Sequence, residues 1–232
     1  MANQSKSPAK IIVIFTALMV LIVAALIYVN QAEKNKLAEI ESEKAEQFKL
    51  NPPSTEGQPT LGNVESNVTV VEFGDYKCPS CKIWEQMIFP QLKADYIDTG
   101  KINYAFINTL FHQQESVIAS LAAEAVYAQD PEAYWDFHQA IYELQPDVNH
   151  DEAWVTIDAM TNLAAETVPS LDLQKFQEDM AQNAFMNNLN IDMGLVQYYE
   201  VMQTPTIMVN GTKIQEFLDY EELKGLIEAE LQ

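Results

Sequence analysis

The sequence predicts an α/β domain with an all-helical insertion, preceded by an N-terminal transmembrane helix. Residues 11–29 form an apolar run of nineteen residues. A short β-branched and aromatic run at residues 68–73 leads through Cys-Pro-Ser-Cys into a helical pattern, which is typical of a strand followed by a helix. No Lys or Arg occurs between Lys101 and Lys175, where apolar residues recur at helical spacing. These three features predict the anchor, the α/β core and the insertion.

Composition limits the class of protein. The chain has 232 residues, 48% of them hydrophobic, which is enough for one buried core. It carries 13 Lys, no Arg and 34 acidic residues, for a net charge of −21. That balance argues against nucleic acid and against docking on an anionic membrane surface. Both cysteines lie in one motif, which excludes a disulfide scaffold and a cysteine-rich zinc site.

The N-terminal segment predicts an uncleaved, single-pass signal-anchor. At about 1.5 Å per residue, residues 11–29 nearly span a hydrocarbon core of about 30 Å. The apolar run is longer than that of a cleaved signal peptide, and Asn30 makes a poor cleavage site. Residues 1–10 are expected in the cytoplasm and the rest outside the cell membrane. Residues 30–58 then predict a solvated helical stalk and a Pro- and Gly-containing linker.

Residues 59–113 predict the first part of the α/β core. An edge strand at 60–62 and a buried strand at 68–73 precede a helix at 82–99, which Pro90 is expected to kink. Gly100 ends this helix, and a second long strand follows at 101–107.

Residues 114–188 predict four or so helices, and residues 189–232 return to the α/β core. Helix starts are expected at Asp130 and at Asn149 or Asp151. The last part predicts a helix at 190–201, a strand at 207–209, an Asn210-Gly211 hairpin turn and a pairing strand at 213–215. A capping box of Asp219 and Glu222 begins the final helix.

The Cys-Pro-Ser-Cys motif carries the chemistry. Cys78 comes just before the first helical turn, and Pro79 occupies the first helical position, where its missing N–H costs nothing. A sulfur at that place faces unpaired backbone N–H groups and the positive end of the helix dipole, and both favour thiolate over thiol. Cys81 lies three residues on, in the same turn, so the pair suits a dithiol that cycles between two states.

The order of elements and four short stretches carry a family resemblance. These are residues 70–81 (VVEFGDYKCPSC), 89–90 (FP), 135–138 (WDFH) and 204–209 (TPTIMV). From about residue 57 to the end the chain resembles the thioredoxin fold with the helical insertion of the DsbA family. More closely, it looks like the membrane-anchored BdbD-type thiol-disulfide oxidoreductases of Gram-positive bacteria.

The resemblance implies roles for the site residues. Cys78 would be the sulfur that a substrate thiolate attacks, and Cys81 its partner. Thr204 and Pro205 resemble the cis-proline loop that binds an extended substrate peptide beside the motif. Pro79 and Ser80 would complete the substrate-binding surface, with Ser80 in the place where some relatives carry a His.

Glu72 has two interpretations. In the family an acid at this position lies beneath the dithiol and relays the proton of the second cysteine, which here is Cys81. Alternatively, Glu72 turns outward or pairs with Lys77 or Lys82. Asp75 is interpreted as a turn residue, since it follows the strand directly.

The histidines are the remaining candidate ligands and bases. His138 is interpreted as a packed core residue, whereas His112, in a loop after the second long strand, could border the active-site face. We expect no cofactor besides the redox-active disulfide and no catalytic metal. A structural Ca²⁺ is conceivable in so acidic a domain, although no loop has EF-hand spacing.

Three functions stay open from the sequence. The first is an extracytoplasmic dithiol oxidase that donates the Cys78–Cys81 disulfide to reduced exported proteins. The second is a surface reductase or isomerase on the same fold, and the third a non-catalytic module in which the motif is structural or binds copper. For the oxidase, the resemblance implies a quinone-linked, DsbB-like (BdbC-type) membrane partner. The chain is expected to be a monomer.

Overall fold

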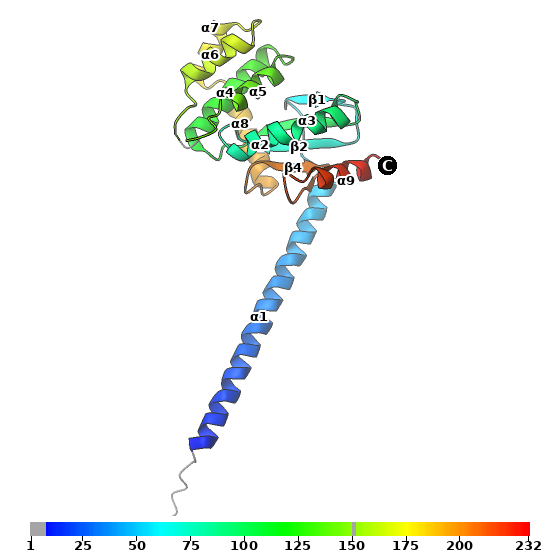
Figure 1. The fold of residues 1–232 in the computed structure, drawn as a ribbon, viewed down its shortest axis with the longest axis vertical. Helices are drawn as coiled ribbons and strands as arrows, with labels where there is room; N and C mark the ends of the chain where they lie inside the picture. Colours follow the sequence, from blue (N-terminus) through cyan, green and yellow to red (C-terminus); the bar gives the residue numbers. More distant parts are fainter. Residues whose placement is uncertain (1–7, 150–151) are drawn as a thin grey trace, which may run out of the picture. The chain divides into compact units, whose positions relative to one another are not determined.

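The protein is described by a computed structural model covering residues 8–149 and 152–232. The described chain separates into two compact units that meet in sequence between Gln47 and Phe48. Helix α1 (Pro8–Leu50) runs through the predicted anchor and stalk (Figure 1). Its described portion is long and apolar enough to cross a membrane. The predicted cytoplasmic tail lies mostly outside the described residues.

A five-stranded sheet forms the centre of the second unit. Its order is β1-β3-β2-β4-β5, with β2 and β3 parallel and the other pairs antiparallel. The strands are β1 (Thr60–Gly62), β2 (Thr69–Gly74), β3 (Asn103–Asn108), β4 (Thr206–Val209) and β5 (Thr212–Lys213). Because β2 and β3 run in parallel and in register up to Gly74 and Asn108, the loops that follow them leave the same edge of the sheet.

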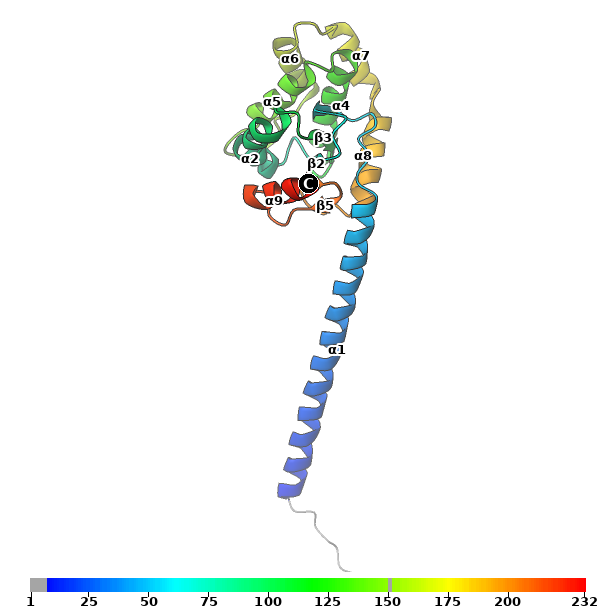
Figure 2. The same ribbon diagram turned by 90° about the vertical axis from the view of Figure 1, so that its right-hand side faces the viewer.

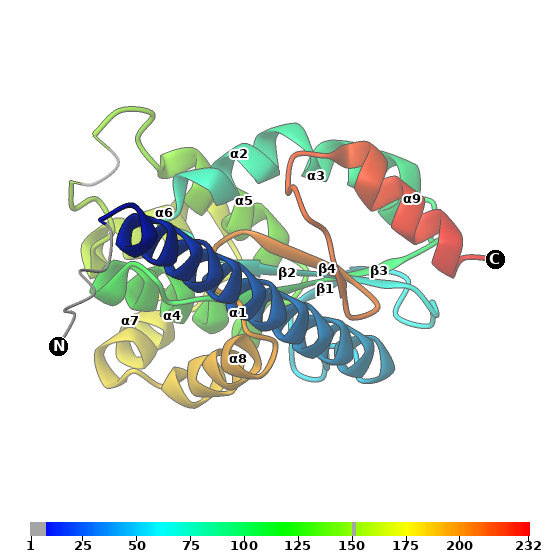
Figure 3. The same cartoon turned by 90° about the horizontal axis from the view of Figure 1, so that it is seen from below.

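The side chains of the central strand, β2, point alternately to the two faces of the sheet, and this divides the core into two layers. Val70 packs with Trp84 and Leu223 on the face covered by α2, α3 and α9. Val71 and Phe73 pack on the opposite face with residues of α8. Figure 3 shows α2, α3 and α9 on one side of the sheet and α8 on the other. This period-two burial is what a strand buried on both faces requires.

The helix after the motif is divided into three pieces. Helix α2 (Pro79–Met87) is followed by α3 (Phe89–Leu92) and a π-helical turn, η1 (Lys93–Ile97). The break falls just before Pro90, which confirms the expected kink, because proline removes a backbone donor and crowds the preceding turn. Gly100 ends the segment at φ 71°.

The helical segment forms its own core. It comprises α4 (Gln113–Gln129), α5 (Tyr134–Leu144), α6 (Ile157–Thr167), α7 (Leu173–Gln182) and the start of α8 (Met186–Tyr198). In Figures 1 and 2, α4 to α7 gather at one end of the sheet. The buried residues of this core are continuous with Tyr76, Cys78, Cys81 and Phe106. The dithiol therefore lies where the helical core meets the sheet.

Both predicted helix starts in this segment are displaced. Helix α5 begins at Tyr134 with Ala133 as its N-cap, and Asp130 Oδ1 accepts from the Ala133 N–H in the turn before it. Helix α6 begins at Ile157, where the Thr156 hydroxyl caps the backbone N–H of Ala159, and not near Asn149. Asp151, the other expected start, lies outside the described residues. The true cap was hidden because Thr156 follows a loop whose acidic and Asn residues also favour helix N-termini.

The C-terminal part follows the prediction with one correction. Asn210 and Gly211 have φ values of 44° and 83°. A type I′ hairpin turn requires a positive φ at both of these positions. Asp219 caps α9 (Tyr220–Glu230) by accepting from the N–H of Glu222. The Glu222 carboxylate does not complete the reciprocal box, because it accepts from the N–H groups of Gln215 and Glu216.

The predicted solvated stalk ends earlier than expected. Phe48 is buried, and its ring lies 5.2 Å from that of Tyr199. The Tyr199 hydroxyl donates to the carbonyl of Asn51 at 2.7 Å. The last turn of α1 therefore belongs to the core of the second unit.

The close packing at the end of β2 yields a stability prediction. A Cβ at Gly74 would lie 2.2 Å from the Phe106 ring and 2.8 Å from Glu72 Oε1. We expect Gly74→Ala to lower the free energy of unfolding by about 1–3 kcal/mol, because the ring and the carboxyl are both buried. Thermal unfolding of the full chain in detergent, followed by near-ultraviolet circular dichroism, measures this.

Gly194→Ala, at an exposed position of helix α8, is the matched control. A Cβ there meets nothing within 4 Å, so alanine should be neutral or stabilise by up to about 1 kcal/mol. Equal unfolding temperatures for Gly74→Ala and the wild type would show that the space beside Phe106 is not constrained.

Candidate active site

The two cysteines sit where β2 passes into α2. Cys78 is the N-cap of α2, with extended backbone at φ −76° and ψ 122°, and Pro79 is the first helical residue. Cys78 retains 7% of its accessible surface and Cys81 none. Both are free thiols, so the structure describes the dithiol form. The more accessible sulfur is therefore Cys78, as the family resemblance implies.

The surroundings lower the pKa of Cys78 to about 5. The largest cause is a hydrogen bond from the Cys81 thiol, and the Thr204 side chain and the backbone N–H groups of Cys81 and Ser80 add to it, against the opposing effect of burial. The sequence predicts that the N-terminus of α2 is the main cause of the low pKa of Cys78. The structure corrects that order, because the second thiol of the same turn contributes more than the amides.

Cys81 has the opposite character. Burial raises its pKa well above the usual value, and the bond to Cys78 and the charges of Cys78 and Glu72 raise it further. The backbone N–H of Asp75 donates to Cys81 Sγ at 3.4 Å. One sulfur is thus an accessible thiolate near neutral pH, and the other a buried thiol that needs help to lose its proton.

The predicted proline loop lies against this dithiol. The Thr204–Pro205 peptide bond is cis, and the Cys78 thiol donates to the Thr204 carbonyl at 3.3 Å. The register explains the proximity: Thr206 pairs with Phe73, so the residues just before β4 lie beside the residues just after β2. Pro79 and Ser80 are half-buried at the start of α2, next to Cys78.

Glu72 points inward, and it interacts electrostatically with both cysteines. It is fully buried on β2 and accepts a short hydrogen bond from the Tyr104 hydroxyl. Its other oxygen, Oε1, has no partner among the described residues. The outward alternative is wrong, because Lys77 pairs with Glu115 at 2.9 Å and Lys82 with Asp147 at 2.7 Å. Burial, with the nearby Glu85 carboxyl, raises the pKa of Glu72 well above its usual value.

A second buried acid and a histidine extend this layer. Glu85 lies one helical turn after Cys81, and burial raises its pKa to about 8. Its Oε1 lies 3.3 Å from Nε2 of His138, whose Nδ1 lies 2.9 Å from the Tyr76 hydroxyl. His138 is buried, as predicted, and burial lowers its pKa to about 3. The spacing of four from Cys81 was the available sequence signal for Glu85.

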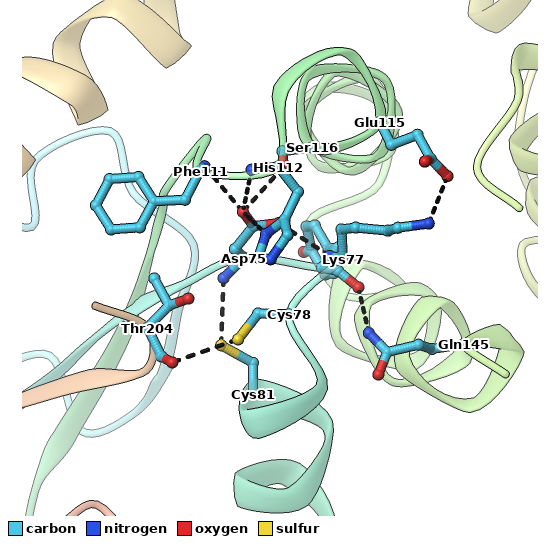
Figure 4. A network of polar contacts seen from close by, with 11 residues as sticks. Asp75, Lys77, Cys78, Cys81, Phe111, His112, Glu115, Ser116, Gln145 and Thr204 are labelled. Atoms are coloured by element: carbon cyan, nitrogen blue, oxygen red, sulfur yellow. Dashed lines mark hydrogen bonds and ion pairs between the residues drawn. The ribbon is translucent and has the colours of Figure 1, made fainter. Parts of the chain in front are cut away.

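Asp75 is more than the turn residue that the sequence suggested. It is fully buried, and its Oδ1 accepts from the backbone N–H of Lys77. Its Oδ2 accepts from the N–H groups of Phe111 and His112, the Ser116 hydroxyl and His112 Nδ1 (Figure 4). One carboxylate thereby ties the motif loop to the loop between β3 and α4.

The described residues contain no group of three or more His, Cys, Asp or Glu side chains that could hold a metal ion. The nearest approach is a pair of largely buried carboxylates away from the cysteines, Glu124 and Asp192. Asn108 donates to both, and Gln58 to Asp192. Burial raises the pKa of both carboxyls, that of Glu124 to about 7.

An acidic, accessible thiol beside a buried thiol and a cis-proline loop, on a thioredoxin fold, defines a thiol-disulfide oxidoreductase. A thioredoxin family model matches residues 54–229. Disulfide bond formation protein D of Bacillus subtilis is 42% identical over 78% of this chain and 80% of the relative. The chain belongs to the disulfide bond formation protein D (BdbD) family of these enzymes.

Other relatives and solved structures agree. The probable disulfide bond formation protein D of Bacillus anthracis is 35% identical over 75% of this chain and 79% of its own length. The crystal structure of oxidised BdbD from Bacillus subtilis matches with a TM-score of 0.74, covering 77% of this chain and 95% of that one. Chlamydia trachomatis DsbA, at 22% identity, has a TM-score of 0.66 over 77% of this chain and 93% of its own, and shows the fold alone.

The difference between the two sulfurs can be measured by alkylation. With a pKa of about 5, Cys78 is almost wholly thiolate at pH 7 and about one-tenth thiolate at pH 4. We therefore expect iodoacetamide to modify Cys78 about tenfold more slowly at pH 4 than at pH 7. Mass spectrometry of the reduced full chain should find Cys81 unmodified at both. Modification of Cys81 at a comparable rate would contradict this assignment.

Proposed function

We propose that this thiol-disulfide oxidoreductase is an oxidase that donates the Cys78–Cys81 disulfide to reduced proteins outside the cytoplasm. The acidity of Cys78 carries the proposal. A pKa near 5 stabilises the reduced, thiolate form of the pair, so the disulfide form gains electrons readily. An acidic leaving thiol also speeds release of the oxidised substrate from Cys78.

The electrons and protons balance in two exchanges. A substrate thiolate attacks Cys78 Sγ, the Cys78–Cys81 bond breaks, and Cys81 leaves as a thiolate. Glu72, whose pKa burial raises well above the usual value, would supply a proton to that sulfur. A second substrate thiolate then attacks the substrate sulfur of the mixed disulfide, and Cys78 leaves as a thiolate. Two substrate thiols are oxidised and the cysteine pair is reduced.

The cis loop would position the substrate. Family membership implies protein thiols as substrates and a redox partner that restores the disulfide. Pro205 has no N–H, and the Thr204 carbonyl lies 3.3 Å from Cys78 Sγ. The Thr204 backbone would pair with an extended substrate strand at this position beside the dithiol. Ser80 and Pro79 would border that strand.

An apolar helix long enough to cross a membrane supports a membrane partner. The apolar helix α1 would anchor the chain as a single span with the catalytic unit outside the cell membrane. A quinone-linked, DsbB-like (BdbC-type) protein in the same membrane would then reoxidise the cysteine pair. Because both proteins would lie in one membrane, the effective concentration of each for the other would be raised. The catalytic unit would act as a monomer.

Oxidation of a reduced model protein tests the direction of exchange. The oxidised full chain in detergent should reactivate reduced ribonuclease, and Cys78→Ala should abolish this. Cys81→Ala should accumulate mixed disulfides when it is mixed with the oxidised substrate. The Cys78 thiolate attacks a substrate disulfide and releases one substrate thiolate, and the Cys81 thiol that would expel the other is missing. Non-reducing gels will show these adducts.

The equilibrium potential separates the oxidase from its alternative. A potential near about −120 mV supports an oxidase, and one near about −270 mV a reductase. No thiol exchange with glutathione at all would favour the non-catalytic structural or copper-binding module.

We also propose that the conceivable structural Ca²⁺ binds at Glu124 and Asp192. Two buried carboxylates lie together, and the buried Oδ1 of Asn108 has no partner among the described residues. Ca²⁺ takes carboxylate and amide oxygens of this kind. No step of the exchange depends on it.

Calcium binding would appear as a gain in stability. We expect 1 mM CaCl₂ to raise the unfolding temperature of the wild type relative to EGTA, because a ligand that binds only the folded state stabilises it. Asp192→Asn should lose this gain, whereas Glu178→Gln, at an exposed acid of α7, should keep it. Identical unfolding temperatures in calcium and EGTA would contradict the site.

A further inference from the structure

His112 lies on the exposed side of the site, opposite to the buried acids. It belongs to the loop between β3 and α4, which leaves the same sheet edge as the loop carrying Cys78. Its side chain is 40% exposed, and its Nδ1 lies 2.8 Å from Asp75 Oδ2. Figure 4 shows Asp75 with its carboxylate turned towards this loop and its backbone towards the cysteines. The ring is thus held in place while one side remains open to solvent.

The contacts of Asp75 identify His112 as its counter-ion. Several backbone N–H groups and the Ser116 hydroxyl donate to the two oxygens of Asp75. This pattern suits an ionised carboxylate, which can only accept. No Lys or Arg side chain among the described residues pairs with it in these contacts. A fully buried carboxylate of this kind favours a cationic partner, and the imidazole at 2.8 Å is the group in that position.

The lysines flanking the motif are engaged elsewhere. Lys77 Nζ donates to Glu115 at 2.9 Å and to the carbonyl of Glu152 at 2.6 Å. Lys82 Nζ donates to the carbonyl of Gln145 at 2.5 Å and to Asp147 at 2.7 Å. Both ammonium groups are thus turned towards the helical segment, and neither contacts Cys78 in the described structure.

The geometry links His112 to the dithiol through Asp75, whose carboxylate lies 2.8 Å from the imidazole Nδ1 and whose backbone N–H donates to Cys81 Sγ at 3.4 Å. The hydrogen bond that His112 donates to Asp75 is the main cause that raises the pKa of His112, and the charge of Cys78 raises it further. Coupling between two charges is reciprocal, so a protonated His112 stabilises the Cys78 thiolate by the same free energy.

We propose that His112, oriented by Asp75, is a titratable cation that stabilises the Cys78 thiolate and makes the oxidising strength of the dithiol depend on pH. It would supply, from a separate loop, positive charge that Ser80 cannot provide from within the motif. The proposal rests on the Cys78 thiolate of the proposed function, and it holds for either direction of exchange.

The pH dependence follows from the groups that face the imidazole. These are Asp75 from the motif loop, Cys78 and Lys77 at the start of α2, and Ser116 from α4. Asp75 and the thiolate favour the protonated ring, and Lys77 opposes it. The charge on His112 therefore persists to higher pH than that of an ordinary histidine and is lost as the pH rises through its raised pKa. Stabilisation of the thiolate is present below that pH and absent above it.

The experiment compares three variants of the full chain in detergent. His112→Asn removes the charge, His112→Lys retains one, and Gln114→Ala, at an exposed neighbouring residue, is the control. Two quantities are measured: the Cys78 thiolate titration by absorbance at 240 nm, against a Cys78→Ser baseline, and the equilibrium constant with glutathione at pH 6 and pH 9.

We expect His112→Asn to lower the thiolate fraction at pH 5 by about two- to fivefold. The equilibrium constant for reduction by glutathione should fall by about three- to tenfold at pH 6 and remain unchanged at pH 9. His112→Lys and Gln114→Ala should match the wild type at pH 6. Adding Ser80→His to His112→Asn should restore much of the loss at pH 6.

Two results would overturn the proposal. One is an unchanged Cys78 titration in His112→Asn, and the other is a loss of equal size at pH 6 and pH 9, which indicates a structural effect only. Absence of glutathione exchange in the wild type would instead count against the proposed function. The absorbance titration would still decide the role of His112 in that case.

Discussion

The buried carboxylate of Asp75 is the contact on which the geometry of the site depends. It is the first residue after β2, and it holds the β3–α4 loop and the first turn of α4 through bonds to Phe111, His112 and Ser116. Its own backbone N–H meets Cys81 Sγ. Parallel strands bring these two loops to one edge of the sheet, but parallel pairing alone does not set how the loops face each other. The carboxylate supplies that constraint, and so it orients both the thiol pair and the histidine.

The chemistry then follows from an asymmetry of burial. Two cysteines three residues apart lie on one turn, yet one retains contact with solvent and the other retains none. The hydrogen bond between them favours the thiolate on Cys78 and the thiol on Cys81, so each sulfur shifts the pKa of the other in the opposite direction. The buried Glu72 carboxyl strengthens the difference, because its charge raises the pKa of Cys81 further. A pair of identical residues thereby acquires two distinct roles.

Much of this could be predicted from local sequence. The strand, the motif and the first helical turn are consecutive, and the cis peptide at Pro205 was anticipated from Thr-Pro placed just before a strand. Glu72 was recognised because an acid inside an apolar strand is costly without a use. These inferences depend on residues within a few positions of one another.

The features that were missed are contacts between distant parts of the chain. The partners of Asp75 Oδ2 lie 36 to 41 residues further along the chain. The sequence alone therefore could not distinguish the role of Asp75 from that of a turn residue. Glu85 had a local signal, but its contact with His138 spans 53 residues. The importance of the Cys81 thiol for Cys78 was underrated because helix N-termini are general, whereas the orientation of one thiol depends on the full packing. Tertiary geometry decided each of these points.

The helical insertion also shapes the site electrostatically. It supplies the acids and carbonyls that hold Lys77 and Lys82, the two cations next to the motif in sequence. Without those partners the lysine side chains would be free to approach the thiolate, and an ammonium there would retain its charge across the working pH range. By engaging them, the insertion leaves His112, bound to Asp75, as the proposed cation near the dithiol. Histidine titrates near neutral pH, so this division of charges allows the acidity of Cys78 to follow the pH of the surroundings.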